Sequence, residues 1–223
     1  MSTCEKRTGL VRRWLFLTVG LVIMSLGVAL SIRADLGTSP ISSVPYVASL
    51  FSPLSVGTAS IVMHCVMILI QILLLRRRYD PVQLLQLPVA IVFGYLTDFA
   101  VWLVSFLQPA AYWQQWLLCL VGIALVGIGV SCEVTAGVAT MAGEGVVLAV
   151  CQVTPVKFGT MKVTFDVTLV VIACTLSLLF LGHLAGVREG TVAAALLVGQ
   201  VARRMNRALE PVDRRLLTGY GDC

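Results

Sequence analysis

Leu-Gly-Thr-Ser-Pro-Ile-Ser-Ser-Val-Pro, residues 36–45, interrupts an apolar run that begins near Trp14. Glycine, proline and hydroxyl residues favour turns and helix ends, so this stretch predicts a helix break inside the membrane. When the sequence is shifted along itself by 102 residues, residues 14–58 lie over residues 116–160 without a gap, and 12 of the 45 positions are identical. The break therefore occurs twice, and its second copy is Val-Ala-Thr-Met-Ala-Gly-Glu-Gly at residues 138–145.

Several of the identical positions are glycine, proline or threonine, where chance matches in an apolar chain are least expected. The identical pairs are Trp14/Trp116, Leu15/Leu117, Val19/Val121, Gly20/Gly122, Gly27/Gly129, Val28/Val130, Ala34/Ala136, Thr38/Thr140, Val44/Val146, Pro53/Pro155, Gly57/Gly159 and Thr58/Thr160. We interpret this match as an internal repeat that includes the first apolar segment, which argues against a cleaved signal peptide at the N-terminus.

The composition excludes an ordinary soluble domain. Of the 223 residues, 58% are hydrophobic, and the mean hydropathy is +0.95. Soluble domains are less apolar and carry about 25% charged residues, against 12% here. The seven cysteines show no C-x-x-C spacing and mostly lie in apolar segments, so they predict neither a metal site nor a disulfide framework. We therefore expect an integral membrane protein.

The apolar segments predict six membrane spans and two short re-entrant helices. The expected spans are residues 14–32, 57–75, 81–107, 114–132, 158–181 and 190–203, and the short segments follow the breaks at 36–51 and 135–151. Thr38 or Ser39 is expected to cap the first short helix, with Pro40 as its first residue. The domain plan is a basic N-terminus at 1–13, repeat 1 at 14–107, repeat 2 at 108–204 and a basic tail at 205–223.

The basic residues predict the orientation, because lysine and arginine favour cytoplasmic loops. With both termini in the cytoplasm, 13 of the 16 basic residues lie on that side. Each half has three spans, so the second half must enter the membrane from the opposite side. The predicted fold is therefore an all-α membrane protein built from two inverted-topology repeats. Nucleic acid is not an expected partner, because the net charge of +5 is concentrated next to apolar segments.

Inverted repeats with broken helices are used by many secondary transporters, which bind solute near the bilayer midplane. A broken helix leaves backbone polar groups that must line a cavity or meet a ligand. The candidate solute-binding residues are Thr38, Ser39, Ser42, Ser43, Thr140 and Glu144. The alternative is that these hydroxyls only cap and pack the short helix.

Ionisable residues inside spans cost roughly 2.5–3.5 kcal/mol each on insertion scales, so they are functional candidates. The candidate ion-coupling residues are Asp98, Lys162 and Asp166. Lys162 and Asp166 are four residues apart on one helix face, and Glu144 is a further partner for Lys162. The alternative is that Lys162 and Asp166 only neutralise one another. Glu133 is a further ionisable candidate, and the alternative is that it lies at the membrane boundary and faces water.

No enzyme motif is present: the chain lacks H-E-x-x-H, G-x-S-x-G, a P-loop and a dinucleotide fingerprint. Gly37-Thr-Ser39 looks like an intramembrane serine site, but Pro40 follows it, and the only histidines are His64 and His183. We therefore expect no catalytic residues, no cofactor and no metal.

Three motifs in the first half resemble the YitT/YczE group of bacterial membrane proteins: Ala34-Asp-Leu-Gly-Thr-Ser-Pro40, Gly57-Thr58 and Gly94-Tyr-Leu-Thr-Asp98. Similar motifs follow in the second half, at 143–145, 158–162, Asp166 and 186–191, so the resemblance covers about residues 14–204. It implies a location in the bacterial cytoplasmic membrane. The function of that group is largely uncharacterised, so the resemblance implies little about mechanism.

The sequence thus favours a secondary transporter or channel-like permease for a small polar or anionic solute, with a proton or another ion as a coupling partner. The alternative is a membrane adaptor that assembles or regulates another complex through its basic tail. Deleting residues 206–223 separates the two, because a permease should tolerate the loss and an adaptor should not. A membrane-embedded enzyme is a third hypothesis, and self-association into a homo-oligomer is compatible with the sequence but not decided by it.

Overall fold

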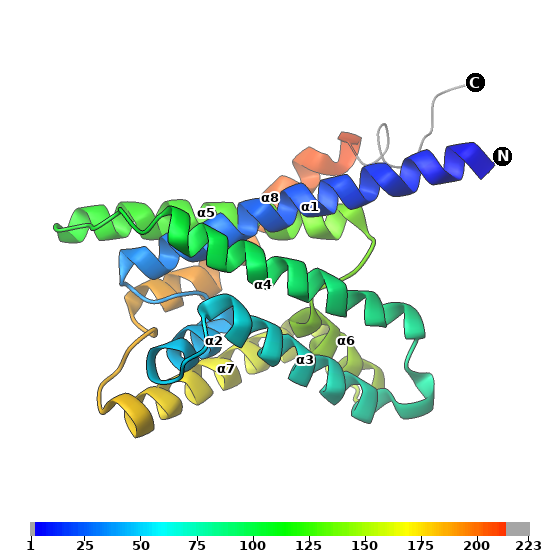
Figure 1. Cartoon of the computed structure of the whole chain (residues 1–223). Helices are drawn as coiled ribbons and strands as arrows, with labels where there is room; N and C mark the ends of the chain where they lie inside the picture. Colours follow the sequence, from blue (N-terminus) through cyan, green and yellow to red (C-terminus); the bar gives the residue numbers. More distant parts are fainter. Residues whose placement is uncertain (1–2, 213–223) are drawn as a thin grey trace.

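The structure is a computed structural model that describes residues 3–212, with side chains described for 11–209 except Arg77. Every regular element in this part of the chain is helical (Figure 1). The elements are α1 (Thr3–Ala34), α2 (Pro40–Phe51), α3 (Val56–Leu75), η1 (Arg76–Arg78), η2 (Pro81–Leu85), α4 (Gln86–Leu103), α5 (Tyr112–Ala136), α6 (Ala142–Val153), α7 (Phe158–Leu181) and α8 (Glu189–Val212).

Five helical segments are long and apolar enough to cross a membrane. They are Val11–Ala34, Val56–Leu75, Pro81–Leu103, Tyr112–Ala136 and Phe158–Leu181. The expectation of an all-α, multi-span membrane protein is therefore confirmed. The third segment ends at Leu103, four residues before the predicted end, because the chain turns at Val104.

The sixth predicted span, residues 190–203, lies in α8, which is not among these five segments. Only residues 190–202 of α8 precede its first arginine, Arg203, and at 1.5 Å per residue they extend about 20 Å. A bilayer core is about 30 Å thick. The apolar part of α8 is thus shorter than the bilayer core. α8 packs along α5. The tail residues 213–223, with Arg214 and Arg215, lie outside the described part.

The two predicted breaks interrupt helices at corresponding places. α1 ends at Ala34 and α5 at Ala136, and the 12-residue helices α2 and α6 begin at Pro40 and Ala142. Each short helix is about 18 Å long, so neither can cross the bilayer alone. Both pairs of residues are 102 positions apart, which is the shift that aligns the sequence with itself.

α1 and α5 pack against each other through glycines, and this is the most extensive contact between two helices in the described structure; both helices run across the upper part of Figure 1. A Cβ atom on Gly27 would lie 2.7 Å from the Gly122 carbonyl oxygen, and one on Gly20 would lie 3.2 Å from that of Gly129. Because the earlier glycine of each helix meets the later one of the other, the two helices are antiparallel. The absent side chains bring the backbones into close contact.

The remaining helices are placed less evenly. α4 packs against both α1 and α3, whereas α7 packs mainly against the short helices α2 and α6. Gly57 at the start of α3 lies against Gly94 and Asp98 of α4, but its counterpart Gly159 in α7 has no atom near its Cβ position in the described structure. Three threonine hydroxyls of α7 donate to carbonyls four residues earlier in the same helix: those of Thr164, Thr168 and Thr175.

Candidate functional site

The first break places four hydroxyl residues at the start of α2. Ser39 occupies the cap position and Pro40 is the first helical residue, as predicted. The Ser39 hydroxyl does not cap the helix, because it donates to the hydroxyl of Ser42 at 3.0 Å. Ser43 donates to the Pro40 carbonyl at 2.7 Å. Within the described residues, these three hydroxyls are therefore occupied by contacts inside the same segment.

Thr38 differs from its three neighbours. Its side chain is 1% exposed, and its hydroxyl has no hydrogen-bond partner within the described structure. Its backbone N–H donates to the Gly186 carbonyl at 3.1 Å, which holds the residue in place. A buried hydroxyl without a partner costs free energy unless water or a ligand meets it. Thr38 is thus the strongest candidate for a solute contact in the first break.

The second break gathers the ionisable residues. Lys162 donates to Asp166 at 2.8 Å, and both side chains are partly exposed. Glu144, in the first turn of α6, is half-buried and lies within Coulombic range of Lys162, Asp166 and Glu133. The predicted grouping of Lys162, Asp166 and Glu144 is therefore present. Together with Glu133, these residues form a cluster of three carboxyl groups and one ammonium group, which we call the charged cluster.

Glu133 belongs to this cluster, and it does not face water, which was the alternative considered for it. Its side chain is 3% exposed, and its carboxyl group accepts a hydrogen bond from the Met141 N–H at 2.5 Å. This contact ties the end of α5 to the start of α6, where backbone N–H groups lack helical partners. No local sequence pattern predicts this contact, because its partners are eight residues apart on opposite sides of the break.

Asp98 is held apart from the other candidates by a capping role. One carboxyl oxygen accepts from the Ser55 hydroxyl at 2.6 Å, and the other accepts from the Gly57 N–H at 2.7 Å. Ser55 is the cap residue of α3, so Asp98 joins α4 to the start of that helix. Both of its oxygens thus have partners, which favours a structural role over ion coupling.

Buried amides connect the second break to α3 and α4. Gln71 donates to the Gln86 side chain at 3.1 Å and to the Ala142 carbonyl at 2.9 Å. These are the interhelical hydrogen bonds expected of glutamines in membrane spans. About two turns earlier in α3, His64 is 2% exposed, and its Nε2 has no partner in the described residues. The interior near the second break is therefore polar.

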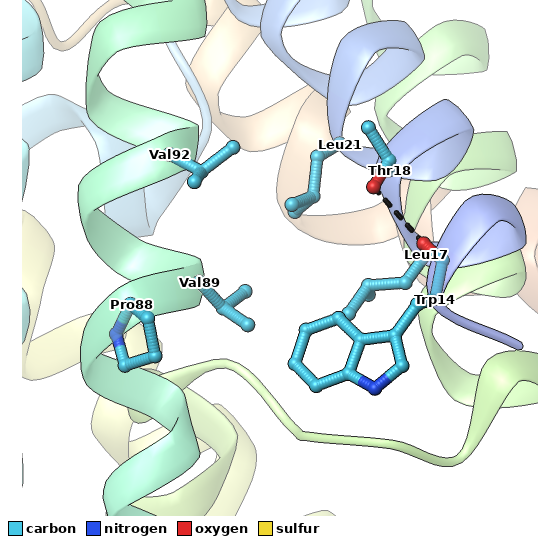
Figure 2. A pocket seen from close by; sticks show the side chains of 7 residues that line it. All are labelled: Trp14, Leu17, Thr18, Leu21, Pro88, Val89 and Val92. Carbon is cyan, nitrogen blue, oxygen red and sulfur yellow. Dashed lines mark hydrogen bonds between the residues drawn. The ribbon is translucent and has the colours of Figure 1, made fainter. Parts of the chain in front are cut away.

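The described part of the structure contains cavities, of which two bear on a solute site. One has a volume of about 130 Å³ and lies between α1 and α4 (Figure 2). Its lining is apolar except for Thr18, whose hydroxyl donates to the Trp14 carbonyl, so it does not suit a polar solute. The other has a volume of about 220 Å³ and is lined by Asp80, Val82, Gln83, Gln86 and residues 137–140, including the exposed Thr140.

Fold and site together define an α-helical, multi-span membrane protein with broken helices and a charged cluster near the second break. By comparison with family models, the chain belongs to DUF6198, a family of unknown function, which is matched over residues 11–207. No curated protein and no solved structure matches the chain. The resemblance to the YitT/YczE group stays a prediction, because the matched family is described without that name.

Proposed function

We propose that the protein is a secondary transporter or permease for a small polar or anionic solute, built from two inverted repeats of three spans each. In this proposal α8 is the sixth span, with Arg203 and Arg204 extending their side chains to the membrane surface. The protein lies in a bacterial cytoplasmic membrane with both termini in the cytoplasm. The distribution of basic residues supports that orientation.

The observation that carries the proposal is the correspondence of backbone geometry at the two breaks. Asp35 and Gly137, which follow α1 and α5, both adopt left-handed conformations, with φ of 53° and 60°. Ser39 and Met141, which precede the short helices, have ψ of 152° and 147° at the same φ of −60°. A non-glycine residue at positive φ is uncommon, so this agreement supports two copies of one structural unit.

The glycine contacts between α1 and α5 support the same symmetry. Under the shift of 102 residues, Gly20 corresponds to Gly122 and Gly27 to Gly129. The contact of Gly20 with Gly129 therefore corresponds to the contact of Gly122 with Gly27, and both contacts are present. An interface that is its own counterpart is expected around a two-fold axis, and inverted repeats in transporters have such an axis in the membrane plane.

The two breaks supply different chemistry to the solute. In this proposal Thr38 and the start of α2 contact a polar or anionic group, since helix N-termini favour negative charge. Glu144 and Asp166 carry the coupling proton or ion, with Lys162 setting the charge balance of the cluster. Asp98 has no coupling role in this proposal, because its two carboxyl oxygens accept hydrogen bonds at the start of α3.

Thermal stability of the detergent-purified protein tests the proposal, because a ligand that prefers the folded state raises the melting temperature. The panel contains amino acids, organic acids, sulfur compounds and inorganic ions. A solute at 100 times its Kd should stabilise the protein by about 2.7 kcal/mol. A panel without any shift, in protein shown to be folded, would contradict the proposal.

The variant Thr38→Val locates the site. It removes a hydroxyl that has no partner in the described structure, so the melting temperature without solute should not fall. The shift caused by the solute should fall. The matched control is Thr164→Val on the exposed side of α7, whose hydroxyl bonds only its own helix. A solute shift that survives Thr38→Val would remove the first break from the site.

A further inference from the structure

The two ends of the molecule are closed to different degrees. At one end, segment 35–38 is bound to segment 186–191 by three hydrogen bonds. The Gly190 N–H donates to the Leu36 carbonyl at 2.8 Å, and the Thr38 N–H donates to the Gly186 carbonyl at 3.1 Å. The Arg188 guanidinium donates to the Asp35 carbonyl at 2.8 Å. We call this pair of segments the latch.

The latch depends on glycines, because its two backbones are in contact. A Cβ atom on Gly37 would lie 2.6 Å from the Arg188 nitrogen, and one on Gly190 would lie 2.6 Å from the Leu36 carbonyl oxygen. Gly37 and Gly186 also have positive φ, of 93° and 75°. No larger residue fits at these positions without moving the backbone.

At the other end, the corresponding segments stand apart. The shift of 102 residues aligns residues 14–58 with 116–160, and, continued along the chain, it places the latch on segments 137–140 and 84–89. The cavity of about 220 Å³ lies here, between 137–140 and 80–86, and within the described residues no backbone hydrogen bond joins these two segments. We call this cavity the vestibule. Gln83 Oε1, on a residue that lines it, is buried without a partner in the described structure.

The sequence explains why this end does not close in the same way. Pro88 stands where the latch has Gly190, and proline has no N–H to donate. Ala139 and Leu84 stand where the latch has Gly37 and Gly186, so side chains occupy the space that the latch leaves empty. An exchange of conformations between the two halves therefore cannot reproduce the latch at the vestibule end.

We propose that the vestibule is a permanently open access site for the solute, and that passage is controlled at the latch alone. This inference rests on the permease form of the proposed function, since it names the gate of that pathway, and a pathway with one gate does not couple the solute to an ion. It differs from two-gate alternation, in which one end closes whenever the other opens. The vestibule offers acceptors, from the Asp80 carboxylate and Gln83 Oε1, to a solute that donates hydrogen bonds.

Cysteine labelling with a membrane-impermeant maleimide tests the gates without requiring transport. The background has all seven native cysteines replaced, and its melting temperature and elution volume show that it is folded. Single cysteines then report each end: Thr140→Cys in the vestibule and Thr38→Cys, whose side chain is buried at the latch. We expect Thr140→Cys to label at least tenfold faster than Thr38→Cys, and from one side of the membrane only.

Opening the latch is the decisive step. Gly190→Pro removes the N–H that bonds Leu36 and imitates Pro88, and proline is tolerated in the first turn of a helix, where Gly190 lies. We expect labelling of Thr38→Cys to rise at least tenfold in this variant, while labelling of Thr140→Cys stays constant. The matched control on α8 is Gly199→Ala, at a glycine whose Cβ position is open.

Two results would overturn the inference: Thr38→Cys that stays protected in Gly190→Pro, or Thr140→Cys that becomes protected when the latch opens. If Gly190→Pro does not fold, Arg188→Ala takes its place, since it removes one latch hydrogen bond from an exposed side chain. A labelling pattern as expected together with a solute panel without shifts would contradict the proposed function and leave the gate assignment standing.

Discussion

Glu133 illustrates at the scale of one residue how this protein uses acidic side chains inside the membrane. Its carboxyl group binds the Met141 N–H and is buried. The Asp98 carboxyl group likewise accepts hydrogen bonds at the start of α3, from the Ser55 hydroxyl and the Gly57 N–H. A broken helix exposes N–H groups that hydrocarbon cannot satisfy, so an acceptor from a neighbouring segment is needed at each break. Glu133 therefore supplies an acceptor at the second break, and Asp98 supplies one at the start of α3.

Replacing Glu133 by alanine should destabilise the protein by about 1–3 kcal/mol, because the Met141 N–H loses its acceptor in a buried place. Glu133→Gln keeps an acceptor oxygen at the same position and should lose less. Thermal unfolding of both variants in the same detergent measures the difference. Equal melting temperatures for Glu133→Ala and Glu133→Gln would show that the hydrogen bond contributes nothing.

Between elements, the closest packing is that of α1 against α5. The atoms that would meet a Cβ on Gly27 include the Gly122 carbonyl oxygen and the Val126 nitrogen, each at 2.7 Å. These are backbone atoms, so neither can turn away as a side chain could. The helix axes must separate if the residue at position 27 is enlarged.

We predict that Gly27→Ala destabilises the fold by about 1–3 kcal/mol, the usual cost of overpacking. Gly199→Ala should be neutral or stabilising, because it adds a methyl group to open space and removes a helical glycine. Unfolding of the two variants should be compared under identical conditions. A Gly27→Ala protein as stable as Gly199→Ala would mean that α1 and α5 are not in close backbone contact.

The helices and their breaks could be predicted from the sequence, since glycine, proline and apolar length carry that information. α8 was predicted less well, because its apolar part is short and Arg203 follows it directly. The grouping of Lys162, Asp166 and Glu144 was also predicted from the sequence. The latch was not, because its contacts are made by backbone groups of Leu36 and Gly186, which have no distinctive side-chain chemistry. The capping role of Asp98 depends on the packing of α4 against α3, which no local pattern reports.

At the scale of the whole molecule, the helix connections fall at two ends (Figure 1). The α3–α4 and α5–α6 connections lie at the end where α1 begins, and the α4–α5 and α7–α8 connections lie at the other. The arginines at 76–78 belong to the first group. The arrangement agrees with the proposal that α1 begins in the cytoplasm.

This topology predicts labelling from opposite sides. In the cysteine-free background, Val82→Cys in the α3–α4 connection should react with an impermeant reagent only in inside-out vesicles. Gln108→Cys in the α4–α5 connection should react only in intact cells or right-side-out vesicles. Both side chains are exposed, so burial does not hide either one. Labelling of both cysteines from the same side would contradict the proposed orientation.

The threonines of α7 bear on how this helix meets lipid. α7 has few buried side chains, so much of its surface faces outward, where hydrocarbon would be its solvent. Thr164, Thr168 and Thr175 are exposed there, yet each hydroxyl donates a hydrogen bond to a carbonyl of its own helix. Acyl chains therefore meet methyl groups and satisfied oxygens. The surface of α7 at these positions is therefore apolar towards lipid, although the helix contains four threonines.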